Sequence, residues 1–120
     1  MLGFAAGAMF LASSAAHSLL GWKALSAELA KTTAPPDLVR GLSIGWHFAG
    51  LAMLVFGCIV LLSFRDLVKG RAVSLLPAVI IALAYIAFGT YALAITGEPF
   101  FVFTFLIPGL LLLLASAVPA

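Results

Sequence analysis

Four long runs of this chain carry no charged residue, and all of its charged residues lie between or beside them. The runs cover residues 2–22, 41–64, 73–96 and 100–118. A hydrocarbon core of about 30 Å needs about 20 residues of α-helix, since each residue adds about 1.5 Å. Each run has close to this length, so the pattern predicts four membrane-spanning helices.

The composition agrees with contact with the lipid bilayer. Hydrophobic residues make up 65% of the 120 residues and charged residues 8%, which leaves too little polar surface for a water-soluble domain. Spanning segments must satisfy their own backbone hydrogen bonds, and a barrel would alternate apolar and polar residues, which these runs do not. The sequence therefore predicts an all-α, integral membrane four-helix bundle, with residues 1–120 forming a single transmembrane domain.

The segment between the first two runs predicts a short interfacial helix over residues 24–31. One face would be apolar and the other charged, with Trp22, Leu25 and Leu29 opposite Lys23, Glu28 and Lys31. The Thr-Thr-Ala-Pro-Pro sequence that follows would end this helix. Pro77 and Pro108 lie near or inside the third and fourth helices, where we expect local kinks.

Basic residues in short loops favour the cytoplasmic side. The loops on either side of the second run hold three basic residues each: Arg65, Lys69 and Arg71 lie close together, whereas Lys23, Lys31 and Arg40 are spread out. Because its basic residues are more closely spaced, we expect the loop after the second run to lie on the cytoplasmic side. Both termini then lie in the cytoplasm, and the loops over 23–40 and 97–99 lie outside. The net charge of +2 comes from these loops, without the clustered basic face that nucleic acid requires.

Polar side chains from all four helices are predicted to share one level near the outer face. His17 lies five residues before Trp22 and His47 lies six after Gly41, which puts both about 7 to 9 Å inside the interface. The same count gives Tyr91 and Thr104 a similar depth. The other candidate site residues lie about a turn deeper or nearer the surface, and they are Ser13, Trp46 and Glu98.

Three interpretations of this polar layer remain open. The histidines can form interhelical hydrogen bonds, worth up to about 2 kcal/mol. They can hold a metal ion, a haem or another tetrapyrrole, because two imidazoles facing each other at one depth suit bis-histidine ligation by His17 and His47. They can also orient the head group of a lipid or a quinone-like ligand in an apolar pocket between the helices.

Enzymatic chemistry has less support in the sequence. Glu98 and His47 could form an acid and base pair, but Glu98 precedes Pro99 in a sequence that also reads as a solvated turn. Cys58 is the only cysteine, which excludes a disulfide within the chain. We therefore expect no catalytic activity.

Small residues at helical spacing predict close helix packing. The glycine pairs are Gly3 and Gly7, Gly41 and Gly45, and Gly50 and Gly57. Glycines at such spacing let helices approach closely, either within a bundle or in a homo-oligomer. We expect packing within the bundle.

The layout of "AAHSLLGW", "GWHFAGLAMLVFG" and "FLIPGLLLLLA" resembles small bacterial membrane proteins loosely akin to the DoxX-like group. The resemblance covers most of the chain and lies in its layout. It implies the four-helix fold and a bacterial inner membrane, and it implies no activity and no site residue.

Together these patterns predict a membrane protein that binds an apolar ligand or cofactor in the polar layer of His17, His47 and Tyr91. The alternative is a non-catalytic accessory subunit of a larger membrane complex, with the histidines as structural hydrogen bonds. A second alternative is a haem, pigment or metal protein that uses His17 and His47 as ligands.

Overall fold

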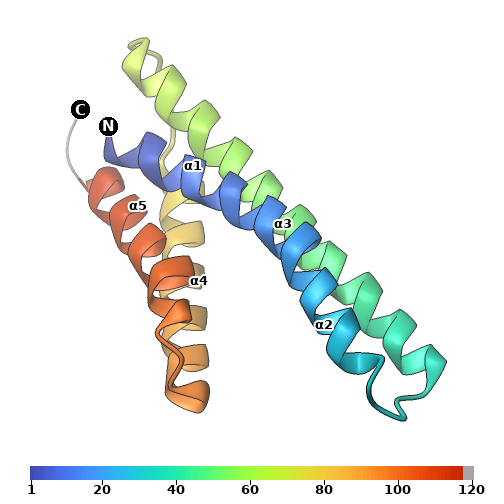
Figure 1. Cartoon of the computed structure of the whole chain (residues 1–120). Helices are drawn as coiled ribbons and strands as arrows, with labels where there is room; N and C mark the ends of the chain where they lie inside the picture. Colours follow the sequence, from blue (N-terminus) through green and yellow to red (C-terminus); the bar gives the residue numbers. More distant parts are fainter. Residues whose placement is uncertain (118–120) are drawn as a thin grey trace.

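The computed structural model describes residues 1–117, and these residues form helices joined by short connections (Figure 1). The first continuous helical segment consists of α1 (Leu2–Ala15), the π-helical turn η1 (Ala16–Gly21) and α2 (Trp22–Leu29). The long helix α3 (Pro36–Val68) returns beside it, and α4 (Leu76–Thr96) follows. The last continuous helical segment consists of the π-helical turn η2 (Val102–Leu106) and α5 (Ile107–Ala117). The all-α prediction is confirmed for the described residues.

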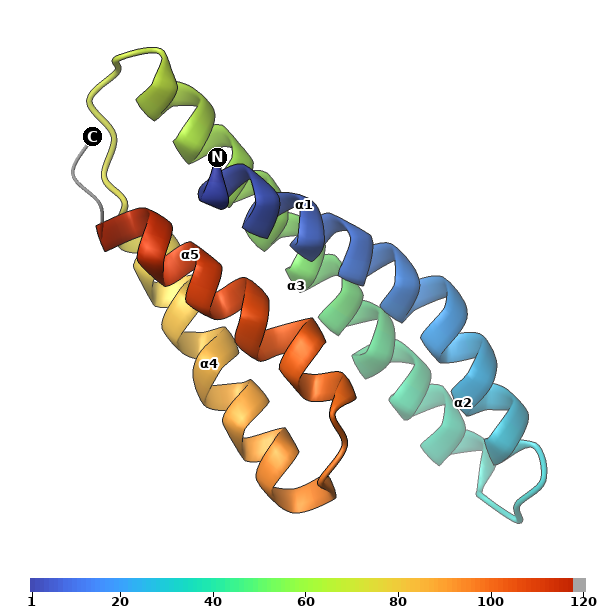
Figure 2. The same ribbon diagram turned by 60° about the vertical axis from the view of Figure 1, so that its left-hand side comes forward.

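The helices pair at one end of the molecule and separate toward the other. The antiparallel α1 and α3 lie side by side, as do α4 and α5, and α5 also packs on α1. Figure 1 shows the α4–α5 pair diverging from α3 toward the end that carries α2, and Figure 2 shows α4 beside α5 and α1 beside α3. The buried core lies at the opposite end, near Met1, and is formed by Ala6, Phe10, Val60, Phe64, Ala78, Ile81, Ala82, Tyr85 and Leu112.

The prediction of a separate interfacial helix over 24–31 is wrong in its boundaries. The helix Trp22–Leu29 follows η1 without a break, so that Leu2–Leu29 is one helical segment. No proline interrupts this segment. Gly21, at the junction, keeps a right-handed helical conformation with φ −64° and ψ −46°, so the helix continues through it. The helix ends before Thr32 to Pro35, as the proline pair requires.

Within residues 1–117, three helical segments are long and apolar enough to cross a membrane, namely Leu2–Leu29, Pro36–Val68 and Leu76–Thr96. The fourth predicted span is shorter than expected, because its apolar helix covers Val102–Ala117. Its predicted last residue, 118, lies outside the described residues. The second helix extends beyond the predicted 41–64 at both ends. Pro36 starts it in the first turn, where the missing N–H of proline costs no hydrogen bond.

The two prolines expected to cause kinks act differently. Pro77 lies in the first turn of α4, which starts at Leu76 and not at 73, so it interrupts no helix. Pro108 lies in α5 directly after η2. A proline inside a helix removes one hydrogen bond and collides with the carbonyl of the preceding turn. The wider π-helical turn η2 lies immediately before Pro108, and its geometry leaves room for the proline ring and for the carbonyl that loses its hydrogen bond.

Glycines at similar spacing have different surroundings. A Cβ at Gly57 would lie 2.7 Å from Leu11 Cδ2 and 3.2 Å from the backbone oxygen of Gly7, so α1 and α3 pack closely here. At Gly41 and Gly45, in contrast, a Cβ would meet no atom within 4 Å. Close packing within the chain is therefore confirmed for Gly3 and Gly7 and for Gly50 and Gly57, where a Cβ would collide with a neighbouring side chain, and it is wrong for Gly41 and Gly45.

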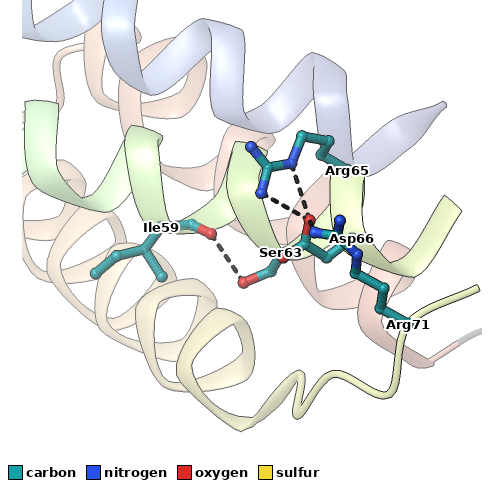
Figure 3. Close-up of polar contacts among 5 residues, drawn as sticks. All are labelled: Ile59, Ser63, Arg65, Asp66 and Arg71. Carbon is teal, nitrogen blue, oxygen red and sulfur yellow. Dashed lines mark hydrogen bonds and ion pairs between the residues drawn. The ribbon is translucent and has the colours of Figure 1, made fainter. Parts of the chain in front are cut away.

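An ion-pair cluster lies at the C-terminal end of α3 (Figure 3). Arg65 Nη2 lies 2.7 Å and Arg71 Nη1 3.0 Å from Asp66 Oδ1, which ties the connection to α4 onto the helix. One turn earlier, Ser63 Oγ donates to the Ile59 carbonyl at 2.8 Å. Exposed pairs of this kind contribute about 0 to 1 kcal/mol, so the cluster orients the connection more than it stabilises the fold.

Candidate functional site

A cavity of about 890 Å³ lies where the two helix pairs separate. One wall comes from α1 and η1, a second from α3, a third from α4 and a fourth from residues 100–105. Both π-helical turns contribute to it, through His17 and Leu20 on one side and Thr104 and Phe105 on the other. π-Helical turns inside longer helices are often found at functional sites. The cavity is therefore the candidate functional site.

The walls of this cavity are mainly aromatic. The rings come from three helical segments and the turn that follows α4, and they are Trp46, Phe56, Tyr85, Phe88, Phe100, Phe101 and Phe105. Tyr85 and Phe105 have ring centroids 5.3 Å apart, and Phe88 meets Phe105 edge-on at 4.9 Å. An apolar, aromatic lining with few polar groups is typical of sites for apolar small molecules.

His17 and Trp46 are held together by two reciprocal hydrogen bonds. Trp46 Nε1 donates to the His17 carbonyl at 2.7 Å, and His17 Nε2 lies 3.1 Å from the Trp46 carbonyl. Their rings also stack, with centroids 4.3 Å apart and planes inclined by 6°. Two side chains of the cavity wall are thus fixed by each other, across the contact between η1 and α3.

This geometry defines the proton on His17. A carbonyl oxygen can only accept, so Nε2 must carry the hydrogen that points at Trp46 O. In the neutral ring Nδ1 is then unprotonated and is left as a hydrogen-bond acceptor. His17 therefore offers an acceptor atom on a side chain that lines the cavity.

We expect Trp46→Phe to lower the unfolding free energy in detergent by about 0.5 to 1.5 kcal/mol, because it removes one interhelical hydrogen bond and keeps an aromatic ring. The matched control is Trp22→Phe, since no hydrogen bond of the Trp22 indole is found within residues 1–117. Thermal unfolding followed by circular dichroism measures both. Equal losses in the two variants would show that the Trp46 hydrogen bond contributes nothing.

Other predicted polar residues have local partners. Thr104 lines the cavity, and its hydroxyl donates to the Phe100 carbonyl at 2.8 Å. Ser13 also lines it. Ser14, which was not predicted as a site residue, donates to the Gly50 carbonyl at 2.7 Å and links α1 to α3. The cavity thus brings together four predicted residues, namely Ser13, His17, Trp46 and Thr104.

Three predicted site residues do not line this cavity. His47 is exposed, its Nδ1 donates to the Ser43 carbonyl at 2.7 Å, and its ring meets Trp22 edge-on at 5.6 Å. Tyr91 is 62% exposed on α4. Glu98 is exposed in the turn after α4, where its backbone N–H donates to Thr96 Oγ1. His17 and His47 share a level along the molecule and do not share a cavity.

Tyr85 is a cavity residue that sequence reasoning missed. It is only 5% exposed, and it packs against Phe10 with ring centroids 4.3 Å apart. Its hydroxyl is buried and has no hydrogen-bond partner among the described residues. Buried hydroxyls normally have a partner, so an unpaired one is a recognised sign of a functional position. Tyrosine in the middle of the apolar run 73–96 was the available signal.

Within residues 1–117, no three side chains of histidine, cysteine, aspartate or glutamate are grouped closely enough to hold a metal ion. Haem or metal ligation by His17 and His47 stays a prediction of the sequence. Comparison with protein-family models, with curated proteins and with solved structures finds no match for this chain. The cavity and its lining are therefore the features of this protein that bear on its function.

Proposed function

We propose that this protein binds an apolar, lipid-like molecule in the cavity between the α1–α3 and α4–α5 pairs, and that it has no catalytic activity of its own. The observation that carries the proposal is the cavity of about 890 Å³ with its aromatic walls. Pockets of about 300 to 1,000 Å³ with a few placed polar groups are typical of small-molecule sites.

The position of the cavity supports access from the bilayer. It lies within the apolar helices that are long enough to cross a membrane, away from the ion-pair cluster of Arg65, Asp66 and Arg71. We place the protein in a bacterial inner membrane with both termini in the cytoplasm, following the density of basic residues in the connection to α4. The cavity then lies in the outer half of the bilayer.

Quenching of tryptophan fluorescence tests this proposal. The chain has two tryptophans, so Trp22→Phe leaves Trp46 as the only one, in the wall of the cavity. Dibrominated methyl stearate is added to this variant in lipid nanodiscs. We expect quenching that saturates at one molecule per chain and is reversed by unbrominated methyl stearate.

Quenching that rises without saturation, as for any lipid-exposed tryptophan, would contradict the proposal. Mass spectrometry of the protein released from nanodiscs identifies any molecule that remains bound after purification. An absorption spectrum of the same sample separates the alternatives, because a Soret band would show a haem protein.

A further inference from the structure

A second cavity of about 470 Å³ continues the first along α3 toward its N-terminal end. The two cavities share three lining residues, namely His17, Trp46 and Ala49. Both cavities therefore border the stacked pair of His17 and Trp46. We call the second cavity the α3 groove.

One face of α3 forms the floor of both cavities. The lining residues recur every three or four positions, as one face of an α-helix requires, and they include Leu38, Gly41, Gly45, Ala49, Met53 and Phe56. From Leu38 to Phe56 this face is about 27 Å long at 1.5 Å per residue. An extended chain molecule can lie along it.

Glycine makes the groove possible at two positions. A Cβ at Gly41 or Gly45 would meet no atom within 4 Å, so these glycines do not serve helix packing inside the chain. Their missing side chains instead leave space beside Leu38 and Leu42, where the groove lies. A Cβ at Gly45 would contact no atom, and a leucine there would extend from it into that space.

Two side chains that line the groove, His17 and Asp37, can accept hydrogen bonds. In the neutral imidazole of His17, Nδ1 is a hydrogen-bond acceptor, because Nε2 carries the hydrogen that is donated to the Trp46 carbonyl. Asp37 lines the far end of the groove with a carboxylate, which accepts only. Arg40 Nη1 lies 3.2 Å from Asp37 Oδ1, so the charge at this end is balanced. A molecule in the groove can therefore donate hydrogen bonds to His17 and Asp37, and it need carry no charge.

We propose that the ligand is an uncharged single-chain lipid with a hydroxyl-bearing head group, of the monoacylglycerol type. Its acyl chain occupies the aromatic cavity, and its head group lies in the α3 groove with one hydroxyl donating to His17 Nδ1. This inference rests on the proposed function, since it assigns the chemical class of the molecule bound in the same cavity.

Two brominated probes with the same acyl chain test the inference. One is a monoacylglycerol with a dibrominated stearoyl chain, and the other is dibrominated methyl stearate, which has no hydroxyl. Both are titrated against Trp46 fluorescence in the Trp22→Phe background. We expect the monoacylglycerol to bind about fivefold more tightly, which corresponds to about one net hydrogen bond.

The variant Gly45→Leu tests the groove separately from the cavity. We expect it to remove the advantage of the monoacylglycerol while the methyl ester binds as before. The matched control is Cys58→Leu, which adds a leucine at an exposed position of the same helix, about 140° away around its axis. This control should leave both affinities unchanged.

The outcomes separate the two claims. If neither probe quenches saturably, the proposed function itself fails. Equal affinities of the two probes for the Trp22→Phe protein would overturn the hydroxyl assignment and leave the apolar binding site in place. If Gly45→Leu weakens both probes by the same factor, the groove does not hold the head group, and the inference is overturned.

Discussion

Replacing Ala84 by tryptophan is expected to lower the affinity for dibrominated methyl stearate about 100-fold. Ala84 lines the cavity from α4, beside the rings of Tyr85 and Phe88. Its own side chain is exposed, so a larger residue extends into the cavity instead of into the buried core. An indole in the space that the acyl chain needs forces one of the two to shift, and overpacking of this kind costs about 1 to 3 kcal/mol.

The variant adds a third tryptophan, so the titration is read by competition. Unbrominated methyl stearate, labelled with tritium, is exchanged on protein in nanodiscs and counted. The matched control is Ala87→Trp, at a position of α4 that is exposed and does not line the cavity. Equal retention by the two variants would mean that the acyl chain binds elsewhere.

Gly57→Leu is expected to destabilise the protein by about 1 to 3 kcal/mol or to prevent its folding. At this position α1 and α3 touch through backbone as well as side chains, since a Cβ would lie 3.2 Å from the Gly7 oxygen. A flexible side chain can turn away, but the backbone of Gly7 cannot move without separating the two helices. The loss should appear as a lower midpoint of thermal unfolding in mild detergent.

Cys58→Leu is the control for this prediction. It places the same side chain one residue further along, at an exposed position of α3. We expect little change in its unfolding midpoint. If the two variants are equally stable, the close contact of Gly7 and Gly57 does not hold the helix pair together.

The helices of this chain follow from the sequence because a single physical constraint governs them. Backbone groups in hydrocarbon must bond within their own segment, and charges are costly there. These two rules separate the apolar runs from the loops at Arg40 and Arg65. They do not define where a helix stops beyond the membrane, which is why the first helical segment continues from the predicted 22 to Leu29 and α3 extends beyond the predicted 41–64 at both ends.

The candidate site could be predicted only in part, because counting residues gives depth and not direction. His17 and His47 were assigned one level from the helical rise. Each residue also turns the helix by about 100°, so His47 points away from the face that Trp46 presents. Tyr91 is exposed for the same reason. The distance of six residues from Tyr85 places it on a different side of α4.

The separation of the two helix pairs could not be predicted at all from these patterns. It depends on which faces are covered along the whole length of each helix, and the glycines illustrate the difficulty. Gly41 and Gly45 have the same spacing as Gly3 and Gly7, yet only Gly3 and Gly7 pack against a neighbouring helix. Small residues permit close approach, and whether a neighbour is present is decided by the rest of the fold.

The two π-helical turns give the cavity walls a property that the core lacks. A π-helical turn holds one more residue than an α-helical turn, and rewinding it shifts the register of the helix beyond it. Both turns of this kind, at η1 and η2, flank the same cavity, while the helices around Phe10 and Val60 stay regular and buried. Rewinding η1 or η2 would thus change the width of the proposed binding cavity for ligands of different cross-section. The buried core around Phe10 and Val60 would not have to open.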